Sequence, residues 1–393
     1  MTAAASDASA PGPLADLVVA DLSRVLAGPY AAMLLGDLGA TVIKVEHPRG
    51  DETRDFRPPV RGGESTYYLS ANRNKRGIVL DFADPHDLAT TRAIIDRADV
   101  VVENFRPGSL ARFGLDYASL AEHRPDLIYA SITGFGTGDG RDLPGYDLSA
   151  QALSGLMSLQ GEPDAAPARA GFALFDVLTG MFAVSGILAA LHHRDRTGAG
   201  QLLELNLMNV ALAAMVNQTT ARVAGGVTPT RMGNEHPSLA PYAPYATRDR
   251  PLVIAVGNDR QFERLCVAIG RPELATDTRF ARNADRTRTR AELRVELEAA
   301  LANADADHWF EALTAAGVPS APLNDIAEGL AFATRLGLDP VTTVGPHEQP
   351  TVRHPVTYSR TPPSYRHAPP GLGEHDAQIR EWIAATPRKD PDV

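Results

Sequence analysis

The segment over residues 22–54 constrains the fold of this chain more than any other stretch of its sequence. It continues a short apolar strand at residues 17–22 and then predicts a turn at Gly28-Pro29, a helix with an apolar stripe, and a second strand over residues 41–46. Proline suits the first position of a helix because its missing N–H would have no partner there. The pattern is that of a βαβ unit, which favours a nucleotide-binding fold.

A βαβ unit of this kind often binds a dinucleotide such as NAD, so that ligand is considered first. Glu46 ends the second strand, where an acid that binds ribose would lie. A glycine fingerprint, however, needs two further glycines after Gly28, and this chain has Tyr30 and Met33 at those positions. Because side chains there would keep a pyrophosphate away from the backbone, the sequence argues against an NAD site.

Strands and helices continue to alternate along the first half of the chain. Further strands are predicted over residues 77–82, 100–103, 127–132 and 202–207. Asp84-Pro85 predicts the start of a helix, since aspartate is a preferred N-cap and proline suits the position after it. The sequence therefore predicts an α/β fold with a Rossmann-like large domain, a mostly parallel sheet, and ligands bound at the carboxyl ends of its strands.

Changes in composition divide the chain into two domains and a tail. The expected parts are a disordered tail at residues 1–13, a large domain at 14–224, a smaller α/β domain at 225–321 and a return to the large domain at 322–393. The apolar helix around residues 177–191 is expected to be too short to span a bilayer comfortably. No membrane association is predicted.

Charge and cysteine content exclude several classes of protein. The formal net charge of -10 argues against a protein that binds nucleic acid or anionic membranes, although basic residues gathered locally can still hold an anionic ligand. Cys266 is the single cysteine, which excludes an internal disulfide and a cysteine-based metal site and fits a reducing cytoplasm. No set of His, Asp or Glu residues has the spacing of metal ligands, so no metal is predicted.

Short motifs in a fixed order carry a family resemblance. They are residues 26–46, Asn74-Lys75-Arg76, DVVVENFRPG at 99–108, GFG at 134–136, GYD at 145–147, Asp176 with TGM at 179–181, TGAGQ at 197–201, GN at 233–234 with PY at 241–242, and LGEH at 372–375. Together they resemble the class III coenzyme A transferases, the family of formyl-CoA transferase and carnitine-CoA transferase. The resemblance implies an interlocked homodimer that moves coenzyme A (CoA) between an acyl-CoA and a small carboxylic acid, with no permanently bound cofactor.

Asp176 is the predicted catalytic residue. From the local pattern alone it is a helix N-cap, because it precedes a long helix with few charges. The resemblance assigns it to the nucleophilic aspartate of the family, and the two roles are compatible. A carboxylate at a helix N-terminus is expected to keep a low pKa and one orientation. Its attack on a thioester would give a covalent aspartyl intermediate.

The residues expected to contact CoA follow from the resemblance and from the strand ends. They are Leu26, Ala27, His47, Arg73, Lys75, Leu80, Asn104, Phe105, Arg106, Arg112, Thr133, Gly134 and Tyr146. The basic members are candidates for the phosphates of CoA, since arginine and lysine form charge-assisted hydrogen bonds with phosphate oxygens. Taken alone, each basic residue is more simply a solvent-exposed charge, and Phe105 is as readily an ordinary core residue.

Two alternatives remain open from the sequence. Racemases of the same family have histidine before aspartate where this chain has Tyr146-Asp147, and without that histidine a two-base racemase lacks one base. The other alternative is a CoA-binding protein without catalysis, against which the presence of Asp176 argues. The roles of His236 and of residues 225–245 stay open.

Overall fold

The computed structural model describes residues 11–389, which form two compact units. Unit 1 consists of the chain up to Leu156, residues 169–227 and the chain from Asp339 onward, and unit 2 consists of residues 157–168 and 228–338. Most of the predicted tail, residues 1–10, lies outside the described residues. Unit 2 includes a short segment before the apolar helix that was not predicted, and the return to unit 1 comes later than residue 322.

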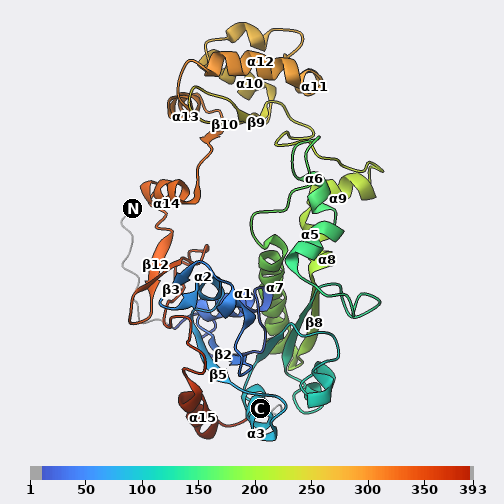
Figure 1. Ribbon diagram of the computed structural model, residues 1–393, viewed down its shortest axis with the longest axis vertical. Helices are drawn as coiled ribbons and strands as arrows, with labels where there is room; N and C mark the ends of the chain where they lie inside the picture. Colours follow the sequence, from blue (N-terminus) through green and yellow to red (C-terminus); the bar gives the residue numbers. More distant parts are fainter. Residues whose placement is uncertain (1–10, 390–393) are drawn as a thin grey trace. The chain divides into compact units, whose positions relative to one another are not determined.

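A six-stranded parallel sheet forms the centre of unit 1 (Figure 1). Its strands are β1 (Val18–Asp21), β2 (Thr41–Glu46), β5 (Lys75–Val79), β6 (Val100–Glu103), β7 (Ile128–Thr133) and β8 (Gln201–Asn206). Their order is β5-β2-β1-β6-β7-β8, and every neighbouring pair is parallel. The order changes direction between β1 and β6, which is the switch point where ligands bind in doubly wound sheets. The predicted α/β fold with a mostly parallel sheet is confirmed.

Helices cover both faces of this sheet because its strands are apolar on both sides (Figure 1). α1 (Ala27–Asp37) and α7 (Leu174–Thr197) cover one face, and α3 (Pro85–Ile95) and α15 (Asp376–Ala385) cover the other. The first core includes Val19, Ala31, Val102 and Ile187, and the second includes Ile43, Ile94, Val101 and Ile379. Both layers leave the carboxyl ends of the strands available for a site.

Shorter elements complete the part of the chain around the sheet. They are the 3₁₀ turns η1 (Glu52–Asp55) and η2 (Ala111–Phe113), the strands β3 (Val60–Arg61), β4 (Glu64–Ser65), β12 (Val341–Val344) and β13 (Gln349–Val352), and the helices α2 (Thr66–Ala71), α4 (Tyr117–Ala121), α5 (Asp147–Leu153), α8 (Leu207–Ala214) and α9 (Val216–Val223). The short helix α6 (Leu156–Leu159) begins at the last residue of this segment of unit 1, and its other residues belong to unit 2. The two small strand pairs, β3 with β4 and β12 with β13, are antiparallel.

Local sequence signals fix several element boundaries. β2 and β6 run over the predicted residues. Asp84 caps α3, because its Oδ1 accepts hydrogen bonds from the backbone N–H of His86 at 2.7 Å and of Asp87 at 3.2 Å. α1 begins at Ala27 and not at Pro29, so the proline lies inside the first turn instead of opening it.

α7 is longer than predicted. It has 24 residues and is apolar, so by length and composition alone it could cross a membrane, and the expectation that it is too short was wrong. In unit 1 it packs on the sheet and against α1. The two helices meet closely at Gly180, where a Cβ atom would lie 2.8 Å from the carbonyl oxygen of Ala27. Glycine at this position lets the N-terminal parts of α1 and α7 approach each other.

Unit 2 has a core of its own. Its antiparallel sheet has the order β11-β10-β9, from β9 (Tyr242–Tyr245), β10 (Leu252–Ala255) and β11 (Ser320–Pro322). Its helices are α10 (Asp259–Ala268), α11 (Asn283–Arg288), α12 (Arg290–Leu301), α13 (Ala306–Ala315) and α14 (Ile326–Arg335), with the 3₁₀ turn η3 (Pro272–Ala275). Cys266 is buried in this core, and burial raises the pKa of its thiol to about 12, as in a packed, unreactive cysteine.

Candidate active site

The loops that follow β1 and β6 meet at the switch point of the sheet. The side chain of Asn104 accepts a hydrogen bond from the backbone N–H of Arg24 at 2.9 Å and donates one to the carbonyl oxygen of Arg24 at 2.6 Å. The next residue, Val25, has a φ of 68°, a left-handed conformation that is strained for a β-branched side chain. Asn104 therefore holds the loop that leads into α1, and its amide is engaged within the protein.

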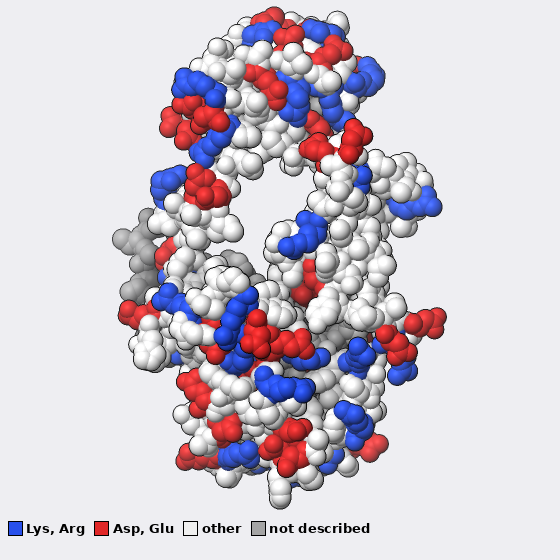
Figure 2. All heavy atoms as spheres, viewed as in Figure 1, with Lys and Arg blue, Asp and Glu red and all other residues white. Residues whose placement is uncertain are grey.

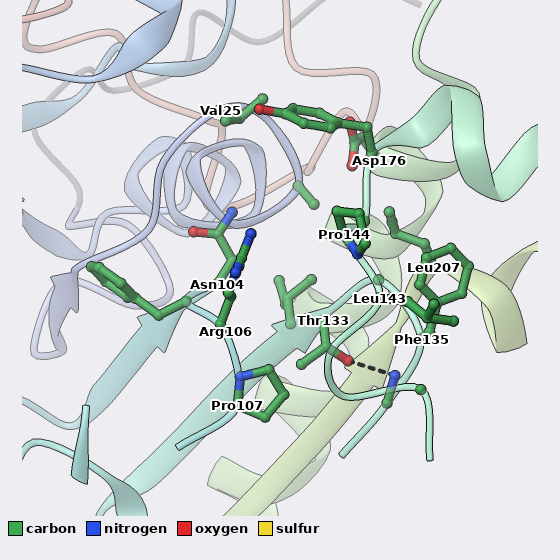
Figure 3. Close-up of a pocket in the computed structure, with 18 of the residues that line it drawn as sticks. Val25, Asn104, Arg106, Pro107, Thr133, Phe135, Leu143, Pro144, Asp176 and Leu207 are labelled. Atoms are coloured by element: carbon green, nitrogen blue, oxygen red, sulfur yellow. Dashed lines mark hydrogen bonds between the residues drawn. The ribbon is translucent and has the colours of Figure 1, made fainter. Parts of the chain in front are cut away.

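A cavity of about 190 Å³ lies beyond the carboxyl ends of β1, β6 and β7, and we refer to it as the Asp176 cavity (Figure 3). In this view Asp176 and Val25 lie at one end of the cavity, and Pro107 and Thr133 lie at the other. The predicted residues that line it are Leu26, Ala27, Asn104, Phe105, Arg106, Thr133, Gly134, Tyr146 and Asp176. Most of the predicted site residues are thus brought together around one carboxylate.

A second cavity of about 570 Å³, the His47 cavity, lies beyond the ends of β2 and β5. The predicted residues that line it are His47, Leu80, Phe105 and Arg112. Arg24, Glu52 and Phe105 line both cavities, so the two adjoin along these side chains. Within residues 11–389, no group of three or more His, Cys, Asp and Glu side chains is arranged to hold a metal ion.

Arg73 and Lys75 line neither of these cavities, and their assignment to the phosphates of CoA was wrong. Arg73 is buried, with its Nε 2.9 Å from Oδ1 of Asp37. Lys75 is buried, with its Nζ 2.8 Å from Oδ2 of Asp21. Both charges are satisfied inside the protein by acids that lie 36 and 54 residues away in the sequence, so no local spacing could reveal the pairing.

Three arginines at the cavities differ from these buried pairs. Arg106 and Arg141 line the Asp176 cavity, Arg112 lines the His47 cavity, and none of the three forms an ion pair with a carboxylate of residues 11–389. Arg24, by contrast, pairs with Glu52 at 2.6 Å. Acidic and basic side chains are interspersed over the face shown in Figure 2, so unpaired cations at the cavities are a local feature. Arg141 was not among the predicted site residues.

Asp176 lies in the first turn of α7 and is not its N-cap, which is Ala173. Burial, together with the negative charge of Asp147, raises the pKa of Asp176 to about 7. The expected low pKa was therefore wrong, because desolvation and a second acid outweigh the effect of the helix N-terminus. Near neutral pH, comparable fractions of this carboxyl group are protonated and ionised.

Asp147 supplies the cap that α7 lacks in its own sequence. Its Oδ1 accepts hydrogen bonds from the backbone N–H of Phe175 at 2.7 Å and of Asp176 at 3.1 Å. Asp147 is the first residue of α5 and is buried. It was not predicted, although the GYD motif that contains it was noted and its neighbour Tyr146 was assigned a role.

Two glycines bring Tyr146 to the Asp176 cavity. A Cβ atom on Gly134 would lie 2.6 Å from the Cα of Gly145, so the loop before α5 can pass closely over the end of β7 only with glycine at both positions. At the same strand end, the backbone N–H of Gly136 donates a hydrogen bond of 3.0 Å to Oγ1 of Thr133 (Figure 3). Tyr146 is exposed, and its hydroxyl lies 3.5 Å from Oε2 of Glu52.

Comparisons with known proteins agree with this fold. The profile of CoA-transferase family III matches residues 14–376. The succinate–glutarate CoA-transferase of Agrobacterium fabrum is 43% identical over 379 residues, which cover 93% of this chain and 94% of that protein. The acetyl-CoA:oxalate CoA-transferase of Acetobacter aceti is 41% identical over 382 residues, which cover 96% of this chain and 97% of that protein.

A solved structure supports the same assignment. The crystal structure of a CAIB/BAIF family protein from Brucella suis matches with a TM-score of 0.87 at 40% identity and covers 95% of this chain and 100% of that chain. The protein is an enzyme that acts on CoA thioesters. It belongs to CoA-transferase family III, so the predicted family is confirmed.

Proposed function

We propose that this enzyme transfers CoA from an acyl-CoA to a carboxylic acid through a covalent intermediate on Asp176. The observation that carries the proposal is the Asp176 carboxylate in the cavity at the switch point, beside the first turn of α1. Leu26 and Ala27 of that turn line the same cavity, and Leu26 makes no side-chain cap. The first backbone N–H groups of a helix have no acceptor within the helix, so this turn offers donors next to the nucleophile.

The first half of the reaction would move CoA onto the enzyme. An ionised oxygen of Asp176 attacks the thioester carbon of the donor, and the C–S bond breaks to give an acyl-aspartyl anhydride and CoA thiolate. The thiolate then attacks the aspartyl carbonyl, which releases the donor as a carboxylate and leaves an aspartyl-CoA thioester. Each step passes through a tetrahedral oxyanion, which the N–H groups of the first turn of α1 would stabilise.

The acceptor acid would then reverse these steps. Its carboxylate attacks the aspartyl-CoA thioester, CoA thiolate leaves, and the thiolate attacks the acceptor carbonyl of the new anhydride. The products are the new acyl-CoA and a free Asp176 carboxylate, with no net proton uptake and no need for ATP. Because attack requires the ionised form and the pKa of Asp176 is raised to about 7, the rate should rise as the pH increases through about 7.

CoA would extend through both cavities. Its nucleotide end suits the His47 cavity, where the exposed side chains of His47 and Arg112 are available to phosphate oxygens. Its thioester end would then reach Asp176 past Phe105, which lines both cavities. This arrangement places the unpaired cations along the anionic ligand.

Short dicarboxylic acids are the proposed donor and acceptor acids. The relatives from Agrobacterium fabrum and Acetobacter aceti are named for succinate, glutarate and oxalate. In this chain, Arg106 and Arg141 line the same cavity as Asp176 and carry no ion pair within residues 11–389. An arginine there could bind the second carboxylate of such an acid while the first reacts.

The proposal includes a cytoplasmic homodimer whose two chains interlock, as the family resemblance implies. α7 supports it with an exposed apolar face, where Met181 and Phe182 are each 49% exposed and Leu188 is 38% exposed. Size-exclusion chromatography with light scattering should give twice the chain mass of 41.9 kDa. A mass of one chain at micromolar concentration would contradict the dimer.

A labelled-CoA exchange assay tests the function directly. The enzyme should move CoA from succinyl-CoA to glutarate or oxalate faster than to monocarboxylates of matched length, and Asp176→Asn should not. The same samples in D₂O separate transfer from racemisation, because this chain has Tyr146 in place of the histidine that serves as one of the two bases of a racemase. Deuterium entering the α-carbon of a branched acyl-CoA at catalytic rates, with no transfer to any acid, would overturn the proposal in favour of a racemase.

A further inference from the structure

We infer that α5 carries a pair of positioning residues, Asp147 and Gln151, that fixes the segment holding Asp176, and that Asp147 places a second acid beside the carboxylate of Asp176. The two residues lie one helical turn apart on α5 and are both buried. Neither needs to touch a substrate to act. The inference rests on the proposed function only in taking Asp176 as the nucleophile.

Asp147 makes the contacts that define the start of α7. Its Oδ1 receives the backbone N–H groups of both Phe175 and Asp176, at 2.7 and 3.1 Å. These amides belong to the first turn of α7, whose own N-cap residue, Ala173, has no side-chain acceptor. One carboxylate from another helix therefore fixes the backbone of the nucleophile itself.

Gln151 ties the loop before α7 to the same carboxylate. Its Nε2 donates a hydrogen bond to Oδ2 of Asp147. Its Oε1 accepts the backbone N–H of Ala170 at 2.8 Å, and its Nε2 also lies 3.4 Å from the carbonyl oxygen of Phe172. Asp147 and Gln151 together therefore engage backbone groups at four positions between residues 170 and 176.

This arrangement affects chemistry as well as structure. The charge of Asp147 lies beside Asp176 and is a cause of its raised pKa, with burial the larger cause. The other titratable or charged groups near Asp176 are Tyr67 of α2 and the cavity-lining Tyr146, Glu52, Arg24, Arg106 and Arg141. Burial, together with the charges of Asp176 and Asp147, raises the pKa of Tyr67 to about 12. That phenol therefore stays neutral when Asp176 titrates near pH 7.

Two variants together distinguish the charge of Asp147 from the hydrogen bonds of Gln151. Asp147→Asn keeps an oxygen that can accept both backbone N–H groups but removes the negative charge, and its amide NH₂ then faces Nε2 of Gln151, so that hydrogen bond is lost as well. Gln151→Ala keeps the cap and the charge but releases Ala170 and Phe172. Asp84→Ala is the matched control, because Asp84 also accepts two backbone N–H groups, at 2.7 and 3.2 Å, at the start of α3 and lines neither cavity.

The first measurement is independent of catalysis. In protein with ¹³C-labelled aspartate carboxyl groups, the resonance of Asp176, identified by its loss in Asp176→Asn, should titrate near pH 7. The midpoint should fall by about one pH unit in Asp147→Asn, since a like charge raises the pKa of its neighbour, and should stay unchanged in Gln151→Ala and Asp84→Ala. An equal midpoint in wild type and Asp147→Asn would overturn the charge role.

The second measurement tests the tether, by which we mean the hydrogen bonds from Gln151 to the backbone of Ala170 and Phe172. Amide hydrogen exchange over residues 170–176 should speed up about tenfold in Gln151→Ala and stay unchanged in Asp84→Ala, because only the first variant frees this loop. The same variant should lower kcat about tenfold with little change in KM, as expected when a nucleophile is misplaced. Unchanged exchange and kcat in Gln151→Ala would overturn the tether role.

A double variant should restore the hydrogen bond between residues 147 and 151 while it keeps the one to Ala170. In Asp147→Asn with Gln151→Glu, the new carboxylate can accept both the amide of residue 147 and the N–H of Ala170. Protection of residues 170–176 should match that of wild type, and failure to restore it would contradict the tether. If the midpoint and the exchange rates change as expected while wild type transfers no CoA, the proposed function fails and the positioning role stands.

Discussion

Two sets of basic side chains in unit 1 differ in whether an acid pairs with them. Lys75 and Arg73 are buried and each is held by a carboxylate, whereas Arg106 and Arg112 at the cavities have no acid partner within residues 11–389. A buried charge without a partner is too costly to persist, so the paired set belongs to the fold. An unpaired cation beside a cavity is available to an anion that is not part of the chain. Pairing therefore separates these buried charges from Arg106 and Arg112 at the cavities, which the proposed function assigns to ligand binding.

The acidic side chains divide in the same way. Asp21 is fully buried and receives Lys75 at 2.8 Å, and burial lowers the pKa of Lys75 to about 8 even though Asp21 opposes this shift. Asp176 forms no ion pair within residues 11–389 and lines a cavity. The comparison predicts that substituting an unpaired charge reduces function, and that substituting a paired one reduces stability.

The largest effect is expected at Asp176. Asp176→Asn keeps the size of the side chain but removes the proposed nucleophile, so the transfer rate should fall by several orders of magnitude, as for other essential nucleophiles. The thermal midpoint should not decrease, because no ion pair within residues 11–389 is lost. Steady-state transfer assays and calorimetry on the same preparation measure both quantities. If Asp176→Asn kept full transfer activity, the comparison between paired and unpaired charges would fail at Asp176.

The next largest effect is on stability at Lys75. Lys75→Met leaves Asp21 buried without its partner, which should lower the free energy of unfolding by about 3–5 kcal/mol. CoA affinity of the remaining folded protein should be unchanged. Urea unfolding measures the first quantity, and Arg353→Ala is the control, because its pair with Asp339 is exposed and should contribute about 1 kcal/mol or less. If Lys75→Met lost affinity for CoA without losing stability, Lys75 would be a CoA-binding residue and not a structural one.

Local signals in the sequence predicted the sheet well because they act over a few residues. Asp84-Pro85 identified the start of α3, and alternating apolar segments identified β2 and β6. The order of the motifs singled out Asp176, which the structure then shows in a cavity at the carboxyl end of the sheet. These features depend on neighbours in the chain, which a single sequence displays.

What could not be predicted depends on contacts between distant residues. The partner of Arg73 is Asp37, on another element, so a buried ion pair was mistaken for a phosphate contact. The cap of α7 comes from Asp147 on α5, 28 and 29 residues before the amides it receives. The raised pKa of Asp176 follows from the same juxtaposition and from burial. None of these has a spacing that a sequence motif could carry.

The affinity for CoA tests the comparison at two of the unpaired arginines, Arg106 and Arg112. Arg106→Ala and Arg112→Ala should each weaken CoA binding by about 1.5–3 kcal/mol, roughly ten- to a hundredfold, because each removes one charge-assisted hydrogen bond. Unfolding free energies should change little, since neither arginine is paired within residues 11–389. Titration calorimetry with CoA is the measurement. If Arg112→Ala binds CoA as wild type does, the nucleotide does not lie in the His47 cavity, and if Arg106→Ala does, Arg106 does not contact CoA.

The smallest predicted effect is the pH dependence of stability. The pKa of Asp176 is about 7 in the folded protein and near its ordinary value of 3.8 when unfolded, so the folded state binds the proton more tightly. Wild type should lose stability from this group as the pH rises from about 4 to 7, and Asp176→Asn should not. At pH 8 the variant should be more stable than wild type by about 1–2 kcal/mol, an amount reduced for partial exposure. If wild type and Asp176→Asn differed in unfolding free energy by the same amount at pH 5 and at pH 8, the raised pKa of Asp176 would be contradicted.

Trapping of the enzyme-bound intermediate tests the central claim most directly. The enzyme is incubated with succinyl-CoA without an acceptor, treated with hydroxylamine or borohydride, digested and examined by mass spectrometry. Hydroxylamine should convert Asp176 to its hydroxamate, and borohydride should reduce its thioester to an alcohol, with no change at Asp176 when CoA alone is supplied. CoA transfer that proceeds at full rate while Asp176 stays unmodified, or a trapped group on another residue, would contradict covalent catalysis by this aspartate.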